Sequence, residues 1–166
     1  MIAARSRTNP LTQSGQSLIE VAFMLPFLLL LMIGVIELGR YAYIGILVGN
    51  AARAGAAYGS QNNVQSVNTV GIQNAAVNDF QSNGQPGASL TVTSAVSCGC
   101  DSSGTVTTAG CTAVTNPTAG TCAAGHWVVI VSVTASGTFN SLFNYPGIPS
   151  SLSISRTAAM RVNVIG

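Results

Sequence analysis

The chain begins with a polar leader, and a long apolar run follows it. Large hydrophobic side chains occupy most positions from Val21 to Ile36, and the leader before them carries Arg5 and Arg7. Between Ser17 and Tyr58 the only proline is Pro26, which can kink a membrane helix without ending it. At about 1.5 Å per residue such a helix is on the order of 60 Å long, roughly twice the apolar core of a bilayer. We therefore expect its second half to project beyond the membrane.

A shorter helix and a small sheet are predicted in the rest of the chain. Partial helical periodicity predicts a helix from about Asn63 to Phe80, and the segment Asn83 to Gly87 supplies a stop. Apolar residues then alternate with a period of two, which is typical of strands. The alternating positions of the three expected strands are Leu90, Val92 and Val96; Trp127, Val129, Val131 and Val133; and Leu152, Ile154, Ala158, Met160, Val162 and Val164. This pattern predicts an α+β fold with a long N-terminal transmembrane helix and an antiparallel sheet.

A glycine and an acid stand at a defined spacing where the apolar run begins. Gly15 precedes the run, and Glu20 lies in its first helical turns, where a carboxylate is costly unless it is paired or serves a purpose. A secretory signal peptide has its cleavage site after the apolar region instead. The segment resembles a prepilin (type III) leader, which implies that a prepilin peptidase cuts between Gly15 and Gln16. The alternative is an uncleaved signal anchor with Glu20 at the membrane interface.

The resemblance also implies a role for Glu20 in assembly. After cleavage, the new amino group of Gln16 would lie one helical turn from Glu20, and the positive end of the helix dipole favours an acid there. In assembled pilin filaments this acid is thought to neutralise the amine of a neighbouring subunit.

Three sequence blocks extend the resemblance along the helix. They are LPFLLLL at 25–31, GVIELGR at 34–40 and NAARAGA at 50–56. From about Ser14 to Tyr58 the chain is similar to the TadE-like family, pseudopilin-like proteins of tight-adherence pilus systems. One departure is Val21, since the residue after the acid is often aromatic in these systems. The resemblance implies a leader at 1–15, a long helix at 16–58 that spans the membrane in its first half, and an extracytoplasmic, pilin-like α+β domain at 59–166.

Composition narrows the function classes. Charged residues make up 6% of the chain, lysine is absent and the net charge is +2. A nucleic-acid-binding protein would need a basic stripe, so no nucleic-acid partner is expected. The sequence has no phosphate-binding glycine loop and no nucleophile-elbow motif to accompany Asp101 and His126. We therefore expect neither catalysis nor a cofactor.

Four cysteines indicate the compartment of the C-terminal part. Arginines flank both ends of the apolar run, so their count does not decide the orientation. Cysteines that are even in number and confined to one loop at 98–122 are typical of an oxidising compartment, with the leader on the cytoplasmic side. The spacing, with His126 four residues beyond the last cysteine, lacks the paired knuckles of common zinc sites. We expect two disulfides, either Cys98 with Cys111 and Cys100 with Cys122, or Cys98 with Cys122 and Cys100 with Cys111.

The predicted helix carries two further candidate features. Glu37 and Arg40 lie three residues apart on one face, where they can pair near the membrane interface, or act as separate interfacial charges with Arg40 snorkelling. Beyond them, small residues recur at steps of three and four and form a seam that permits close approach by another helix or a sheet. The seam residues are Ala42, Gly45, Gly49, Ala52, Ala56 and Gly59.

Two functions fit these expectations. In the first, the protein is a minor pilin-like, or pseudopilin, component of a tight-adherence pilus assembly or secretion machine, held in the bacterial inner membrane. Its partners would be the prepilin peptidase, other pilin or pseudopilin subunits and the assembly platform. In the second, it is a membrane-tethered extracytoplasmic binding or adhesion module that does not enter a pilus. The resemblance and the position of Gly15 favour the first.

Overall fold

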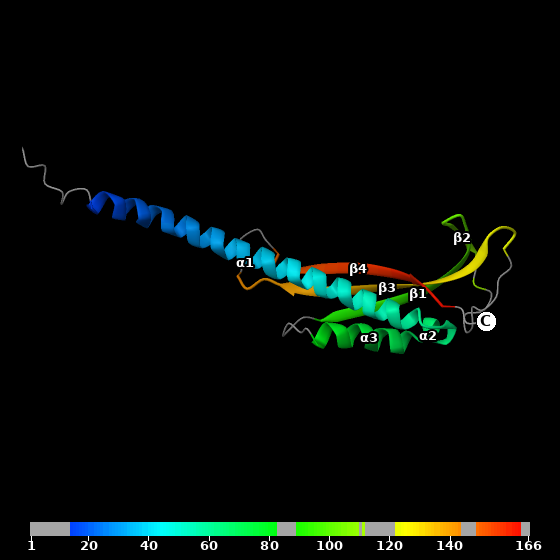
Figure 1. The fold of residues 1–166 in the computed structure, drawn as a ribbon. Coiled ribbons are helices and arrows are strands. Elements are labelled where there is room, and N and C mark those ends of the chain that lie inside the picture. The colour runs from blue at the N-terminus through cyan, green and yellow to red at the C-terminus, as the bar shows by residue number, and fades with distance from the viewer. Residues whose placement is uncertain (1–13, 83–88, 110, 112–121, 144–148, 164–166) are drawn as a thin grey trace, which may run out of the picture. The chain divides into compact units, whose positions relative to one another are not determined.

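The computed structural model describes residues 14–82, 89–109, 111, 122–143 and 149–163. Within these residues a long helix, α1 (Ser14–Gly59), precedes two short helices and a sheet of four strands (Figure 1). The chain divides into two compact units, one ending at Arg40 and one beginning at Tyr41. The predicted α+β class is therefore confirmed, and α1 contributes residues to both units.

Two asparagines define the short helices after α1. The side chain of Asn62 accepts a hydrogen bond from the Gln65 backbone N–H at 2.9 Å and caps α2 (Asn63–Val67). The Asn68 side chain accepts one from the Gly71 N–H at 3.0 Å at the start of α3 (Thr69–Ser82). The single helix predicted from Asn63 to Phe80 is therefore two helices, because Asn68 interrupts the first and caps the second.

The sheet has the order β2-β1-β3-β4, with every neighbouring pair antiparallel. Its strands are β1 (Leu90–Ser102), β2 (Thr105–Ala109), β3 (His126–Asn140) and β4 (Ser151–Arg161). The three predicted strands correspond to β1, β3 and β4; Val164 lies outside the described residues. The sequence analysis missed β2, which pairs with β1 through a turn at Ser103 and Gly104, both with positive φ. Positive φ at both positions is the requirement of a type I′ hairpin turn.

One face of the sheet forms the core of the second unit. Alternation along β3 buries Val129, Val131, Val133 and Ala135, each with no exposed surface. Against this face pack Val48, Ala52 and Ala56 of α1 and Ile72, Ala76 and Phe80 of α3. The opposite face carries small hydroxyl side chains; Thr134 and Thr157 are 2.8 Å apart at their Oγ1 atoms. The second half of α1 is thus part of a helix-on-sheet core.

Candidate functional site

The first half of α1 exposes nearly all of its large apolar side chains. Their exposed fractions run from 48% at Ile36 to 73% at Phe23. The other exposed large residues are Leu18, Ile19, Val21, Met24, Leu25, Phe27, Leu28, Leu29, Leu30, Leu31, Met32, Val35 and Leu38. By length and composition α1 could cross a membrane. An apolar surface of this extent requires lipid or other protein around it.

The predicted processing site lies at the beginning of this helix. Gly15, Gln16 and Glu20 are all helical and exposed. Among the described residues, a side chain at Gly15 would meet nothing within 4 Å. The leader residues 1–13 lie outside the described part of the chain. Cleavage after Gly15 and a charge pair between Glu20 and an amino group remain predictions.

Glu37 and Arg40 form an ion pair on α1, while its position at a membrane interface stays a prediction. Arg40 Nη1 donates a hydrogen bond to Glu37 Oε2 at 3.1 Å. The Glu37 side chain is 13% exposed and that of Arg40 30%. Pairing three residues apart on one helix lowers the cost of carrying both charges at the end of an apolar segment.

The small-residue seam continues into the core of the second unit. Ala52 and Ala56 have no exposed surface, whereas Ala42 is exposed. A Cβ placed on Gly59 would lie 3.0 Å from Val131 Cγ2, so β3 approaches the helix backbone closely there. The C-terminal end of the seam therefore packs on the chain's own sheet.

The middle of the seam lies beneath an arginine of β4. A Cβ on Gly45 would be 3.8 Å from Arg156 Nη2, and one on Gly49 would be 3.9 Å from Arg156 Cγ. Both glycines are half-buried. The aliphatic stem of Arg156 therefore lies across the helix where small residues leave room for it.

A second helix glycine in close contact with the sheet, Gly55, was not among the predicted residues. A Cβ on Gly55 would lie 3.1 Å from Val133 Cγ1 and 3.2 Å from the Ile72 carbonyl oxygen. Gly55 is not on the seam as predicted, but it stands one residue before Ala56 and faces both the sheet and α3. The signal was available, because a glycine inside a helix usually has a packing reason.

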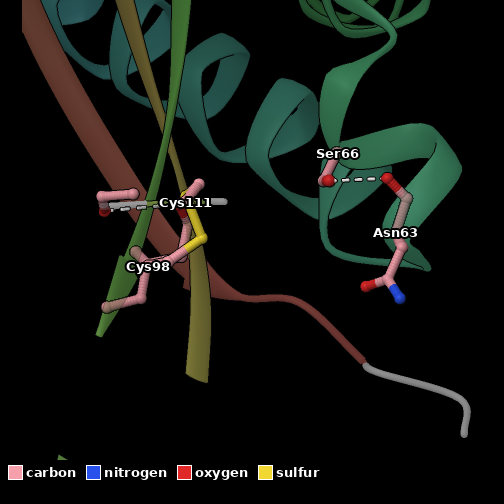
Figure 2. Close-up of a disulfide and its surroundings, with 6 residues drawn as sticks. Asn63, Ser66, Cys98 and Cys111 are labelled. Atoms are coloured by element: carbon pink, nitrogen blue, oxygen red, sulfur yellow. Dashed lines mark hydrogen bonds between the residues drawn. A yellow bond between two sulfur atoms is a disulfide. The ribbon is translucent and has the colours of Figure 1, made fainter. Parts of the chain in front are cut away.

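The structure selects one of the two disulfide pairings left open by the sequence. Cys98 pairs with Cys111 and Cys100 with Cys122, with Cα–Cα distances of 5.2 and 5.7 Å. Figure 2 shows the first bridge, which starts from Cys98 on β1. Cys98 is 2% exposed and belongs to the core, and Cys111 packs against it. The bridges therefore tie the hairpin end of the sheet to the core.

A buried acid at the same end of the sheet was not predicted as a structural element. Asp101 is 5% exposed; Arg161 of β4 donates a hydrogen bond to its Oδ2, and the Gly104 N–H donates to its Oδ1 at 3.0 Å. His126 Nε2 lies 3.9 Å from Oδ2. The Arg161 hydrogen bond lowers the pKa of Asp101 below its usual value although burial opposes the shift; the charge of Arg161, the Gly104 N–H and His126 add smaller effects.

Gly125 packs tightly against this acid. Its φ is 84°, and a Cβ there would lie 2.0 Å from the Asp101 carbonyl oxygen. Only glycine fits this position. The cluster thus fastens β1 to the start of β3 and the end of β4. Within the part of the chain that the structure describes, no group of three His, Cys, Asp or Glu side chains is arranged to hold a metal ion.

Comparison with known protein families gives a match on α1. Residues 15–57 match the family model described as TadE-like protein, which confirms the predicted resemblance over this segment. No curated protein and no solved structure gives a significant match to the chain. The match covers most of α1, both its exposed half and the half that packs on the sheet.

Proposed function

We propose, on the premise that residues 15–57 are a TadE-like segment, that this protein is a minor pilin-like subunit of a tight-adherence pilus assembly or secretion machine. Its role is structural and not catalytic. The first half of α1 sits in the inner membrane before assembly, and the second unit lies outside the cytoplasm. The prepilin peptidase, other pilin or pseudopilin subunits and the assembly platform are its partners.

One observation carries this proposal: a single helix joins an exposed apolar surface to a folded domain. From Leu18 to Leu38 nearly all of the large apolar side chains are exposed, and from Ile44 onward the same helix contributes side chains to a core. A subunit that moves from a bilayer into a filament needs such a helix, because lipid or neighbouring helices must cover its first half in either place. The domain folds around the second half in both environments.

The disulfides support the proposed topology. Two bridges within one small domain indicate an oxidising compartment, since reducing systems keep cytosolic thiols reduced. With the domain outside the cytoplasm, residues before the apolar run face the cytoplasm, where a prepilin peptidase would act. The pairing therefore agrees with cleavage after Gly15.

Removal of the Glu20 charge tests the assembly role. Glu20 lies at the N-terminal end of the apolar run, where an acid costs less than the roughly 2.5 to 3.5 kcal/mol of the helix centre. Glu20→Ala should therefore leave the protein in the membrane fraction with both disulfides formed, while most pili are lost from a shearing assay. Glu20→Asp keeps the charge and should restore at least part of the piliation.

Glu37→Gln provides the matched control, because it removes an acid from the same helix at a position paired with Arg40. It should reduce piliation less than Glu20→Ala does. If the Glu20→Ala strain makes normal pili, Glu20 does not have this role, and the membrane-tethered module becomes the better account. Loss of the variant from the membrane would likewise contradict the proposal.

A further inference from the structure

One end of the second unit exposes apolar and aromatic side chains. Leu142 and Phe143 follow β3 and are 61% and 47% exposed, and Leu152 near the start of β4 is 41% exposed. Tyr41 and Tyr43, the first aromatic residues of α1 in this unit, are 38% and 43% exposed. We refer to these five residues as the loop-end patch.

Contacts between α1 and β3 fix where this patch lies along the helix. Val131 approaches Gly59, Val133 approaches Gly55, and Gly137 approaches Val48. At the end of the strand, the rings of Phe139 and Tyr41 meet edge to face with centroids 5.7 Å apart. The strand therefore runs antiparallel to α1, and each step along β3 moves toward the N-terminal end of the helix.

The lengths of α1 and β3 between these contacts agree. From Val131 to Phe139 an extended strand covers about 26 Å, and from Gly59 back to Tyr41 a helix covers about 27 Å. Leu142 and Phe143 come directly after the strand, so they lie at the end of the unit marked by Tyr41. Hydrogen bonding of the Ser141 N–H to the Ser150 carbonyl at 2.9 Å closes the base of the connection to β4.

Along the chain, this end of the second unit directly follows the apolar segment. Tyr41 follows Leu38, the last exposed large apolar residue of the first unit, by only three residues. If the apolar segment crosses a bilayer, Tyr41 lies within about 5 Å of its end. The chemistry fits this position, because aromatic rings and leucines occupy the membrane–water interface.

The absence of charge also favours lipid. No Asp, Glu, Lys or Arg occurs from Tyr41 to Ala52 or from Phe139 to Ser155. We propose that the loop-end patch is a second membrane contact: Leu142, Phe143 and Leu152 insert into the interfacial layer beside α1 and hold the domain against the bilayer. The contact depends on the membrane segment and not on incorporation into a pilus.

Tryptophan placed in the patch reports its depth in the membrane. The full chain carrying Phe143→Trp is reconstituted in phosphatidylcholine vesicles with or without brominated acyl chains, and the emission of the wild-type chain, which has Trp127 alone, is subtracted. The emission added by Phe143→Trp should shift to the blue and lose about half its intensity in brominated lipid, as expected for an interfacial ring. Leu142→Trp provides a second reporter if the first variant does not fold.

Val64→Trp is the matched control. Val64 is 68% exposed on α2, which follows the end of α1 at Gly59, and Gly59 is about 27 Å along α1 from Tyr41. Its added emission should be unaffected by brominated lipid. The proposal would be overturned if brominated lipid quenched the tryptophan at position 143 no more than the tryptophan at position 64. A blue shift without quenching, growing with the protein-to-lipid ratio, would also overturn it, because the patch would then contact a second copy.

Discussion

Between Leu18 and Leu38 nearly all of the large apolar side chains of α1 are exposed, whereas Ile44, Leu47 and Val48 of the same helix are at most 4% exposed. In the described part of the first unit, residues 14–40, the structure has this helix and no sheet, whereas the second stretch packs on the sheet of its own unit. A continuous helix thus has two stabilising environments. Lipid or other subunits must supply the first, and the chain itself supplies the second.

Side-chain size follows the same division. Leucine, phenylalanine and methionine dominate the exposed half, and Ala51, Ala52, Gly55 and Ala56 dominate the buried half. Small residues let a sheet approach the helix backbone, while large ones suit a lipid environment. Apolar character alone therefore does not identify a membrane span, whereas the size of the apolar residues distinguishes a lipid-facing half of a helix from one that packs on a sheet.

Loss of a disulfide should produce the largest effect and should confine it to the second unit. Each bridge closes a loop of moderate length, with sequence separations of 13 and 22, so its removal should lower the free energy of unfolding by about 3 kcal/mol. Because Cys98 is also buried in the core, the Cys98→Ala/Cys111→Ala pair should cost more than the Cys100→Ala/Cys122→Ala pair. Urea unfolding of the detergent-solubilised chain measures the difference.

Membrane retention is the control for the disulfide variants. The apolar half of α1 should hold both variants in the membrane fraction, since no cysteine lies in it. Release of either variant from the membrane would show that the two regions are not energetically separate.

A glycine-to-leucine substitution should destabilise the second unit in one half of α1 and have no effect on it in the other half. Gly55→Leu would force a side chain against Val133 and the Ile72 carbonyl, so we expect destabilisation of the second unit by about 1–3 kcal/mol. A Cβ at Gly34 meets no described atom within 4 Å, so Gly34→Leu should leave the melting temperature of the second unit unchanged. Thermal unfolding followed by near-ultraviolet circular dichroism distinguishes them, and equal effects would contradict the division of α1.

The stability of the second unit should also fall at acid pH because Asp101 becomes protonated. We expect this effect to be smaller than those of the disulfide and glycine variants. Its pKa is lower in the folded chain, chiefly because Arg161 donates a hydrogen bond to it. The resulting stability is present above the unfolded pKa of about 3.9 and is lost as pH falls through the lower folded value. Asp101→Asn should therefore melt at a lower temperature than wild type at neutral pH, and the difference should begin to shrink below about pH 4 and vanish once the pH is below the lower folded pKa.

Salt provides an independent check on that ion pair. The Arg161 side chain is 53% exposed, so added salt should weaken its charge attraction and narrow the gap at neutral pH. A gap that stays constant from neutral to acid pH would show that Asp101 acts through packing and not through its charge.

Local patterns predicted the long helix, the strands on the core face and the involvement of all four cysteines. A sustained apolar run and alternating valines are signals that a chain carries in its own sequence. The choice between the two disulfide pairings was not available, because it depends on the register that places Cys98 opposite Ala109 in β2. The ion pair of Asp101 and Arg161 was missed for a similar reason, since 60 residues separate its partners.

Single polar side chains account for the other differences. Asn68 divides the predicted second helix because its side chain caps α3, and this competition with the helix backbone is local but easily overlooked. Ser103-Gly104 is a short turn signal inside a stretch interpreted as a loop. The seam residues were found by spacing, but Gly55 was not, because the contact that requires a glycine comes from the sheet and α3.

The intact mass of the membrane-extracted protein tests the central claim most directly. The chain should be isolated from otherwise identical cells with and without the prepilin peptidase. The proposal predicts a mature chain that begins at Gln16 in the first cells, and a chain that keeps Arg5 and Arg7 in the second. A chain that retains the leader in cells with the peptidase would contradict the account and identify α1 as a permanent membrane anchor.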